Sequence, residues 1–344
     1  MIENFIDDEK NFKKERITLP PMENLSLIRS FREKFYSLVS QIPEGRVSTY
    51  GELARSLGSN RAARAVGKML NENPRPEVVP CHRVVKSDGT LGGYDRGKEE
   101  KKKLLEKEGV SVEDEEIVNF EEVLFTDFQS DKPLETLREE QMELKEKVSF
   151  GDDEGDFATI AGVDVSYSEQ RAYPAISLWD RKKKEEKEAY VTKVEVDFPY
   201  IPTFLAFREL PPLLDVLSEA ETKPDVVMVD GNGVMHPHEM GLASHLGLET
   251  KIPTVGVAKS KLCGKIMEDV DKQNRVSEVR KDGSLIGHAV LEGERAKNPI
   301  YVSPGHKVSH ENAVDLVREF CQYKVPDPIR RAHIKATKRR KKDE

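Results

Sequence analysis

The sequence predicts an α/β protein built from two domains. Its 344 residues exceed what one ordinary hydrophobic core organises. The first third contains two short helical segments separated by a Gly-Ser turn, which indicates a helix-turn-helix. Further along, three strand-like runs precede strands that alternate with helices, which is typical of a mixed sheet covered by helices. The predicted parts are a polar lead-in (1–23), a first domain (24–124), a linker (125–132), a second domain (133–334) and a basic tail (335–344).

Helical segments open the first domain. Residues 27–42, LIRSFREKFYSLVSQI, have helical periodicity and end before a Pro-Glu-Gly turn. Residues 49–74 contain two short helices broken at Gly58-Ser59, with Pro74 ending the second. A basic stripe on such a second helix indicates DNA binding, although a basic stripe alone is more often a solvated surface. The apolar positions of this helix are Ala62, Ala65, Val66 and Met69, and the basic positions are Arg61, Arg64 and Lys68.

Next comes Cys81, within the stretch VPCHRVV. A lone cysteine is more often a buried structural residue than a reactive one. Here His82 and Arg83 follow directly and can stabilise a thiolate, while Pro80 restricts the backbone. Neighbouring side chains of an extended segment point to opposite sides, so His82 needs a bent backbone or a bridging water to reach the thiol. The pattern favours a nucleophile.

Charge is distributed unevenly. The net charge is −8, yet residues 106–156 alone carry −14 and the remainder +6. We interpret the acidic segment as a solvated linker with one helix, between two regions that can be locally basic. The last ten residues, KATKRRKKDE, carry six basic side chains and either contact a phosphate backbone or form a disordered solubilising tail.

Composition narrows the class of protein. The start, MIENFIDDEK, lacks the basic and apolar blocks of a signal peptide. No stretch of the sequence approaches about 18 unbroken apolar residues, the length of a membrane-spanning helix. Cys81, Cys263 and Cys321 are widely spaced, which argues against disulfides and a cysteine zinc site. Of these, Cys263 and Cys321 look like core residues. We expect a soluble, cytoplasmic monomer that neither enters a membrane nor acts on a small-molecule substrate.

The second domain opens with a helix over 134–148, LETLREEQMELKEKV. Three hairpin-like strands follow, and then strands and helices alternate. This order resembles the ribonuclease H-like architecture. The predicted strands are 159–167, 174–180, 188–196, 225–230 and 253–258, and the predicted helices are 203–220 and 240–248.

Two aspartates end up in apolar strands of this domain. Asp164 lies within IAGVDVSY, and Asp230 ends VVMVD before a Gly-Asn-Gly turn. Either one alone would more often be a capping or turn residue. Buried carboxylates need a compensating cation or several donors. If the two strands are neighbours, the carboxylates converge on a Mg²⁺ site that Glu209, on the intervening helix, completes.

The first domain resembles a known family. The stretches VSTYGEL, NRAARAVGKMLNENP, VPCHRVV, GTLGGY and LLEKEGV, within residues 30–110, look like the active-site domain of the O6-alkylguanine-DNA alkyltransferases. The resemblance implies a winged helix-turn-helix-like fold without a cofactor. Cys81 would irreversibly take the alkyl group from the O6 atom of a flipped guanine. His82 would be the base, acting through water, and Glu108 would orient it.

This resemblance also implies roles in DNA binding. Tyr50 would help to rotate the base, and Arg64 would fill the gap in the stack. Asn73 and Tyr94 would hold the active-site turn and the guanine. Asp95 departs from the family pattern, because many relatives have a small hydroxyl residue there. The usual amino-terminal domain of the family is replaced by the short lead-in.

The second domain closely resembles endonuclease V over residues 134–333. The stretches are IAGVDVSY, PYIPTFLAFREL, PDVVMVDGNGVMHPHEMGLASHLG, PTVGVAKSKLCGK, SPGHKVS and PDPIRRAH. The resemblance implies a Mg²⁺-dependent nuclease that cuts one strand a nucleotide beyond deoxyinosine, on the 3′ side. Asn232 departs from the pattern, since many relatives have histidine there. By this resemblance, Asp164 and Asp230 would bind the metal, with Glu209 and His333 beside them. Pro199, Tyr200, Ile201 and Pro202 would form the wedge that parts the strands, and Lys259 would contact the phosphate. Gly233 and His236 would lie around the flipped base, and His306 belongs to a carboxy-proximal motif.

We therefore expect a bifunctional DNA repair protein whose partner is double-stranded DNA with alkylated guanine or deoxyinosine. Two alternatives remain open. The first domain could be a lesion-binding module without chemistry, although Cys81 argues against this. The nuclease could act on inosine in RNA, because metal and phosphate chemistry would be unchanged.

Overall fold

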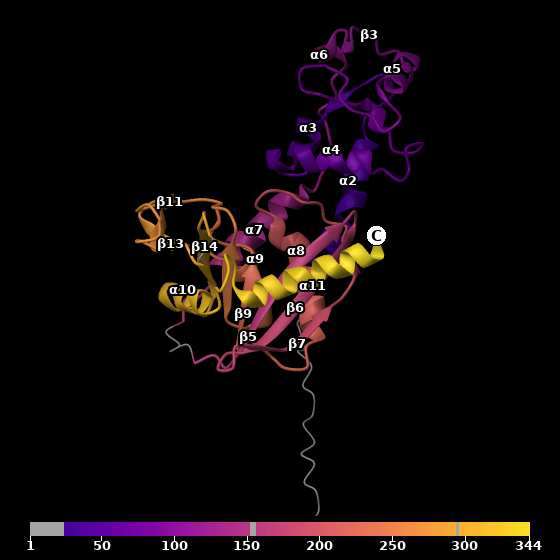
Figure 1. Ribbon diagram of the computed structural model, residues 1–344. Helices are drawn as coiled ribbons and strands as arrows, with labels where there is room; N and C mark the ends of the chain where they lie inside the picture. The colour runs from indigo at the N-terminus through magenta and orange to yellow at the C-terminus, as the bar shows by residue number, and fades with distance from the viewer. Residues whose placement is uncertain (1–23, 152–155, 294–295) are drawn as a thin grey trace, which may run out of the picture.

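The computed structural model describes residues 24–151, 156–293 and 296–344, so the predicted lead-in lies outside the described residues. A small, mainly helical domain lies against a larger domain built on one mixed sheet (Figure 1). The predicted α/β fold class is confirmed. None of the helices in the described ranges is long and apolar enough to cross a bilayer.

The first domain contains the predicted helix-turn-helix. The helix expected over 27–42 is broken at Ser30 into two pieces. Helix α3 begins after Thr49, because its Oγ1 accepts a hydrogen bond from the Glu52 N–H at 3.0 Å. Gly58 provides the left-handed turn, with φ of +95°. The elements are α1 (Leu25–Arg29), α2 (Phe31–Val39), α3 (Tyr50–Ser56), η1 (Asn60–Ala62), α4 (Ala63–Asn71), η2 (Cys81–Arg83), α5 (Lys98–Lys107), α6 (Phe120–Val123), β1 (Ser48–Thr49), β2 (Val84–Val85), β3 (Val112–Glu113) and β4 (Glu116–Ile117).

The second domain is organised by one large sheet of described residues, with strand order β11-β12-β13-β14-β10-β9-β5-β6-β7 and β8 paired to β6. Strand β9 runs parallel to both β5 and β10, and the other pairs are antiparallel. The bounds are β5 (Thr159–Ser168), β6 (Arg171–Asp180), β7 (Glu185–Val191), β8 (Val194–Glu195), β9 (Val226–Asp230), β10 (Thr254–Ala258), β11 (Lys265–Ile266), β12 (Val276–Lys281), β13 (Ser284–Val290) and β14 (Ile300–His306).

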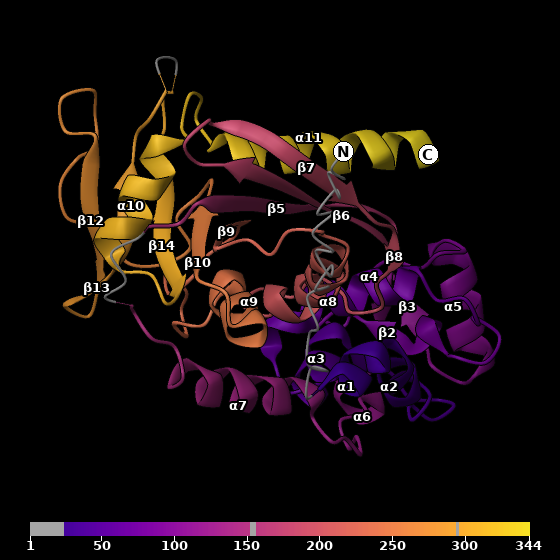
Figure 2. The same cartoon turned by 90° about the horizontal axis from the view of Figure 1, so that it is seen from below.

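Helices cover both faces of this sheet (Figure 2). Along β5, Ala161 and Val163 face α8 and α9, while Ile160 faces the core beneath α10 and α11. Position 162 must be a glycine for α11 to pack this closely, because a Cβ there would lie 2.1 Å from the carbonyl carbon of Pro328. The bounds are α7 (Pro133–Lys145), α8 (Leu205–Ser218), α9 (Leu242–Thr250), α10 (His310–Glu319) and α11 (Asp327–Asp343).

Two predictions about charged segments were wrong. Residues 335–343 are not a separate tail, because α11 continues through them. Ala332 and Ala336 bury this helix against Ala175 of β6, which keeps it on the sheet. The acidic segment 106–156 is more than a linker with one helix, since it also contains the hairpin β3–β4 and helix α6.

One apolar core joins the two domains. Phe31 of α2 packs on Phe198, which precedes α8, with ring centroids 4.7 Å apart. The neighbouring Arg32 donates from Nε to the Asp197 carbonyl at 2.9 Å. Both phenylalanines are buried within the same cluster. The domains therefore form a continuous interior, although 125–132 between them contain no helix or strand.

Candidate active sites

The thiol of Cys81 lines a cavity in the first domain. Cys81 begins the 3₁₀ turn η2, and its side chain is 6% exposed. The cavity measures about 80 Å³ and is also lined by Tyr50, Tyr94 and Asp95. Asn73 Nδ2 donates to the sulfur at 3.0 Å. Burial raises the pKa of Cys81 to about 11, although this hydrogen bond opposes the rise. The thiol therefore needs a base.

The residue after Cys81 in the sequence, His82, is paired with a carboxylate. His82 Nε2 is 2.8 Å from Glu108 Oε1, and Arg83 holds the same carboxylate through Nε and Nη2, each at 2.8 Å. Burial lowers the pKa of His82, although Glu108 works in the opposite direction. Burial opposes the charge of Glu108, but the hydrogen bonds from Arg83 and His82 keep its pKa below the ordinary value. Cys81 and His82 both lie in the η2 turn, where the backbone is bent rather than extended.

Apart from Arg61, the predicted DNA-binding residues of this domain occupy two places. Tyr50 donates to the Gly93 carbonyl at 3.4 Å, and the Tyr94 ring lies edge-on to His82 at 6.4 Å. Arg64 and Lys68 are exposed on the outer side of α4, where Lys68 lies 3.6 Å from Glu72. The apolar side of that helix is buried, as predicted.

Sequence reasoning missed Lys101 on α5. It is fully buried, and its ammonium donates to the carbonyls of Val84 and Gly93, the latter at 3.2 Å. Burial lowers its pKa to about 7, and its charge favours the thiolate of Cys81. Its spacing to Leu105 and Glu108 places all three on one side of α5. The adjacent Lys102 and Lys103 concealed this signal, because any of the three could have faced inward.

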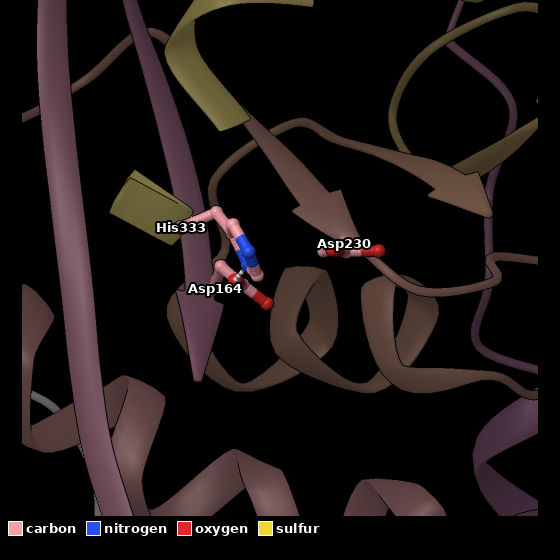
Figure 3. A group of neighbouring side chains, drawn as sticks. All are labelled: Asp164, Asp230 and His333. Atoms are coloured by element: carbon pink, nitrogen blue, oxygen red, sulfur yellow. Dashed lines mark hydrogen bonds and ion pairs between the residues drawn. The ribbon is translucent and has the colours of Figure 1, made fainter. Parts of the chain in front are cut away.

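The second domain brings together three side chains that could hold a metal ion. Asp164 comes from β5, Asp230 from the end of β9 and His333 from α11 (Figure 3). Each offers a ligand atom within 4.8 Å of the others. Val163 pairs with Val229 across the parallel strands, so the following aspartates lie side by side. Oxygen and imidazole donors of this kind suit a divalent cation.

The pKa values of the carboxyl groups in this cluster are raised because the groups are buried close to one another. Burial and the charge of Asp230 raise the pKa of Asp164 to about 6, while His333 Nδ1 lies 2.6 Å from its Oδ2. Burial, Asp164 and Asp230 raise the pKa of Glu209 to about 8. Glu209 is nevertheless not part of the three-residue group. Lys259, which we expected at a phosphate, forms an ion pair with Asp230.

A second cavity, which we call the base cavity, has a volume of about 260 Å³ and is lined by Tyr200, Pro202, Asn232, His236 and Arg61 among others. Tyr200 is 60% exposed. His236 Nδ1 accepts a hydrogen bond from the His238 N–H at 3.2 Å, and burial lowers the pKa of His236 to about 3. Asn232 Oδ1 is buried without a hydrogen-bond partner among the described residues.

Other predicted residues lie elsewhere. Pro199 and Ile201 are buried on either side of Tyr200. Gly233 does not line the base cavity: its N–H donates to Ser303 Oγ at 2.9 Å, and a Cβ there would lie 1.9 Å from the Pro304 carbonyl oxygen. The other outlying residues are His306, which is buried and accepts from the Ser149 N–H at 3.3 Å, and Cys263 and Cys321, which are half-buried beside apolar clusters.

Arg61 departs most from expectation. We predicted it on the DNA-binding stripe of the first domain with Arg64 and Lys68. The structure instead places it at the base cavity of the second domain. Arg61 lies in the 3₁₀ turn η1, which precedes α4, and its charge acts on Arg138 of α7.

Comparisons with known proteins find a matching family for each of the two domains. Residues 142–334 match the family model of Endonuclease V, and residues 30–110 match that of the 6-O-methylguanine DNA methyltransferase, DNA binding domain. A bifunctional methyltransferase/endonuclease of Thermoplasma volcanium is 36% identical over 315 residues, which are 90% of this chain and 89% of that protein.

Solved structures resemble the second domain. The catalytic domain of human endonuclease V superposes with a TM-score of 0.58 at 30% identity, over 62% of this chain and 98% of that chain. Endonuclease V of Ciona intestinalis, solved with a 23mer DNA containing an inosine followed by a ribo-adenosine, gives 0.57 at 29% identity, over 63% and 100%. The chain therefore belongs to the family of bifunctional methyltransferase/endonuclease proteins, with an alkyltransferase DNA-binding domain followed by an endonuclease V domain.

Proposed function

We propose that the protein repairs DNA by two reactions: irreversible transfer of an alkyl group from guanine O6 to Cys81, and Mg²⁺-dependent incision of one strand on the 3′ side of deoxyinosine. One observation carries this proposal. Each domain has its own reactive group, and in the first the Cys81 thiol lines a cavity. In the second, Asp164 and Asp230 lie together, and Asp230 is two residues before Asn232, which lines the base cavity.

In the first reaction, the sulfur of Cys81 attacks the alkyl carbon of a guanine flipped into the cavity. The S–C bond forms as the C–O6 bond breaks. Before the attack, His82 receives the thiol proton through a water molecule, and Glu108 orients the imidazole. The electron pair of the broken bond stays on the guanine, to which His82 then returns the proton through water. Arg64, exposed on α4, occupies the gap left in the duplex.

Mass spectrometry tests this reaction. Incubation with DNA containing O6-methylguanine should add one methyl group to the peptide with Cys81. A Cys81→Ser variant should stay unmodified, and the matched Cys263→Ser variant should react like the wild type. An unmodified Cys81 under saturating substrate would instead support a lesion-binding module without chemistry.

In the second reaction, Asp164 and Asp230 hold the metal ion, with His333 beside them. Mg²⁺ held by these residues would supply Lewis acidity toward the phosphate and the attacking water. Lys259, which pairs with Asp230, contacts the phosphate at the cut. Tyr200 projects from the rim of the base cavity and separates the strands, and the cavity receives the flipped base.

A gel assay tests the incision. A duplex with one deoxyinosine should be nicked in Mg²⁺ and remain intact in EDTA. Asp164→Ala should abolish nicking, whereas Asp315→Ala, at an exposed position of α10, should not. Nicking that survives Asp164→Ala would move the active site elsewhere.

The DNA of the Ciona intestinalis complex contains a ribonucleotide after inosine, so the sugar is worth varying. We propose DNA as the substrate of this chain. Matched oligonucleotides of DNA, of DNA with one ribonucleotide after inosine and of RNA separate the possibilities, since faster cleavage of RNA would reverse the assignment. We also propose that the protein is a monomer, which light scattering after size exclusion checks.

A further inference from the structure

Arg61 is part of the first domain, yet it lines the base cavity of the second. The turn before it is clamped to the second domain. The Leu57 carbonyl accepts a hydrogen bond from the Leu134 N–H at 2.9 Å. At Gly58, a Cβ would lie 2.8 Å from the backbone nitrogen of Glu135. This close packing fixes η1, and with it Arg61, against the start of α7.

The surroundings of Arg61 are positively charged. Within the described ranges, Arg61 makes no hydrogen bond or ion pair. Burial, together with the charge of nearby Arg61, lowers the pKa of Arg138 of α7 to about 10. Arg138 stacks on Phe204 at 4.2 Å and donates to Thr203 Oγ1 at 2.6 Å, so no carboxylate neutralises it either.

Other charged groups nearby do not change this balance. Lys145 and Lys281 both lie within ion-pair distance of Glu239, at 2.8 and 3.3 Å. His236 and His238 are held neutral by burial, with pKa values lowered to about 3 and about 4. Two guanidinium groups thus remain without an acidic partner beside a cavity that opens next to Tyr200.

We infer that Arg61 binds a backbone phosphate of the inosine-containing strand at the base cavity, so that the first domain supplies part of the DNA-binding site of the nuclease. A guanidinium is a planar, always charged donor that matches a phosphate bidentately. Arg138 is already engaged by Phe204 and Thr203, whereas Arg61 is exposed and available. This inference rests on the proposed nuclease function.

The test compares three variants in two assays, using the full chain. Arg61→Ala should raise the concentration of inosine duplex that half-saturates nicking by about tenfold, since it removes a charge-assisted contact. It should also reduce the salt dependence of binding by about one counterion. Methylation of Cys81 should suffer less than nicking. Arg64→Ala should give the opposite ranking, and Arg61→Lys should recover most of the binding.

Arg55→Ala is the matched control, because Arg55 is an exposed arginine of α3 that does not line the base cavity. Thermal unfolding shows whether each variant is folded. If the wild type does not nick inosine DNA, the proposed nuclease function fails. If the wild type nicks and Arg61→Ala nicks with unchanged half-saturation, this inference fails alone. Equal losses in both assays would place Arg61 on the DNA face of α4 and also overturn it.

Discussion

Replacing Glu108 by Gln is the most informative change in the alkyltransferase site. Glu108 accepts hydrogen bonds from Arg83 Nε, Arg83 Nη2 and the ring of His82, each at 2.8 Å. With its Nε2–H donated to Glu108, the neutral ring of His82 presents Nδ1 as the base. Glutamine keeps the size of the side chain but removes the charge and one acceptor, so the imidazole loses both its orientation and its tautomer preference.

The expected loss follows from the acidity of the thiol. With a pKa of about 11 for Cys81, roughly one thiol in ten thousand is ionised at pH 7. A well-placed general base contributes about 10²–10⁴-fold. Glu108→Gln should therefore slow methyl transfer by about a hundredfold or more at pH 7. The variant should gain about tenfold in rate for each pH unit, because it depends on free thiolate.

Rates of methyl transfer between pH 6.5 and 9.5, measured under single-turnover conditions, check this expectation. The wild-type profile should be nearly flat above neutrality, since burial lowers the pKa of His82 and the ring is already neutral. Glu106→Gln, on the exposed side of α5, should behave like the wild type. A Glu108→Gln variant with a flat profile and a rate within threefold of the wild type would refute the proton relay.

Three further predictions concern the rest of the chain. Phe31→Ala should lower the free energy of unfolding by about 3–5 kcal/mol in urea titrations, because a fully buried ring leaves the interface; a loss under about 1 kcal/mol would contradict the shared core. Tyr200→Ala should leave stability unchanged but slow nicking of duplex more than of single-stranded inosine DNA, and equal slowing would exclude a wedge. The folded protein holds a proton on Glu209 up to about pH 8, so in EDTA stability should fall as pH rises from about 5 to 8, by at most about 1.4 kcal/mol per unit. Glu209→Gln should flatten that slope, and an unchanged slope would assign the effect to other groups.

Periodicity in the sequence predicted the centre of each domain. Alternation along β5 sends Ala161 and Val163 to one face and Ile160 to the other, which is the pattern of a strand covered on both sides. The outer strands β11 to β14 were missed, because they are short or partly polar. A signal was nevertheless present: Asp282-Gly283, both with positive φ, joins β12 to β13 as a two-residue hairpin turn.

The sites were predictable to different extents. Asp164 and Asp230 follow from strand order, since the residues before them pair in register. His333 reaches the same point from α11, more than a hundred residues away, and only the resemblance indicated it. Lys101 was hidden among three consecutive lysines. In a helix this polar, the sequence does not show which of the lysines faces the interior.

The contact between the domains could not be predicted from the sequence, for a physical reason. The apolar side of α2 reads the same whether it packs within its own domain or against another. In the structure Phe31 meets Phe198 while both are almost fully buried, so parting the domains would expose both rings to water. The position of Arg61 relative to the base cavity is therefore set by packing and not by a flexible linker. It follows that a change at the interface, such as Phe31→Ala, should disturb nicking through Arg61 even though it touches no nucleic acid, while the aspartate pair on β5 and β9 stays in place.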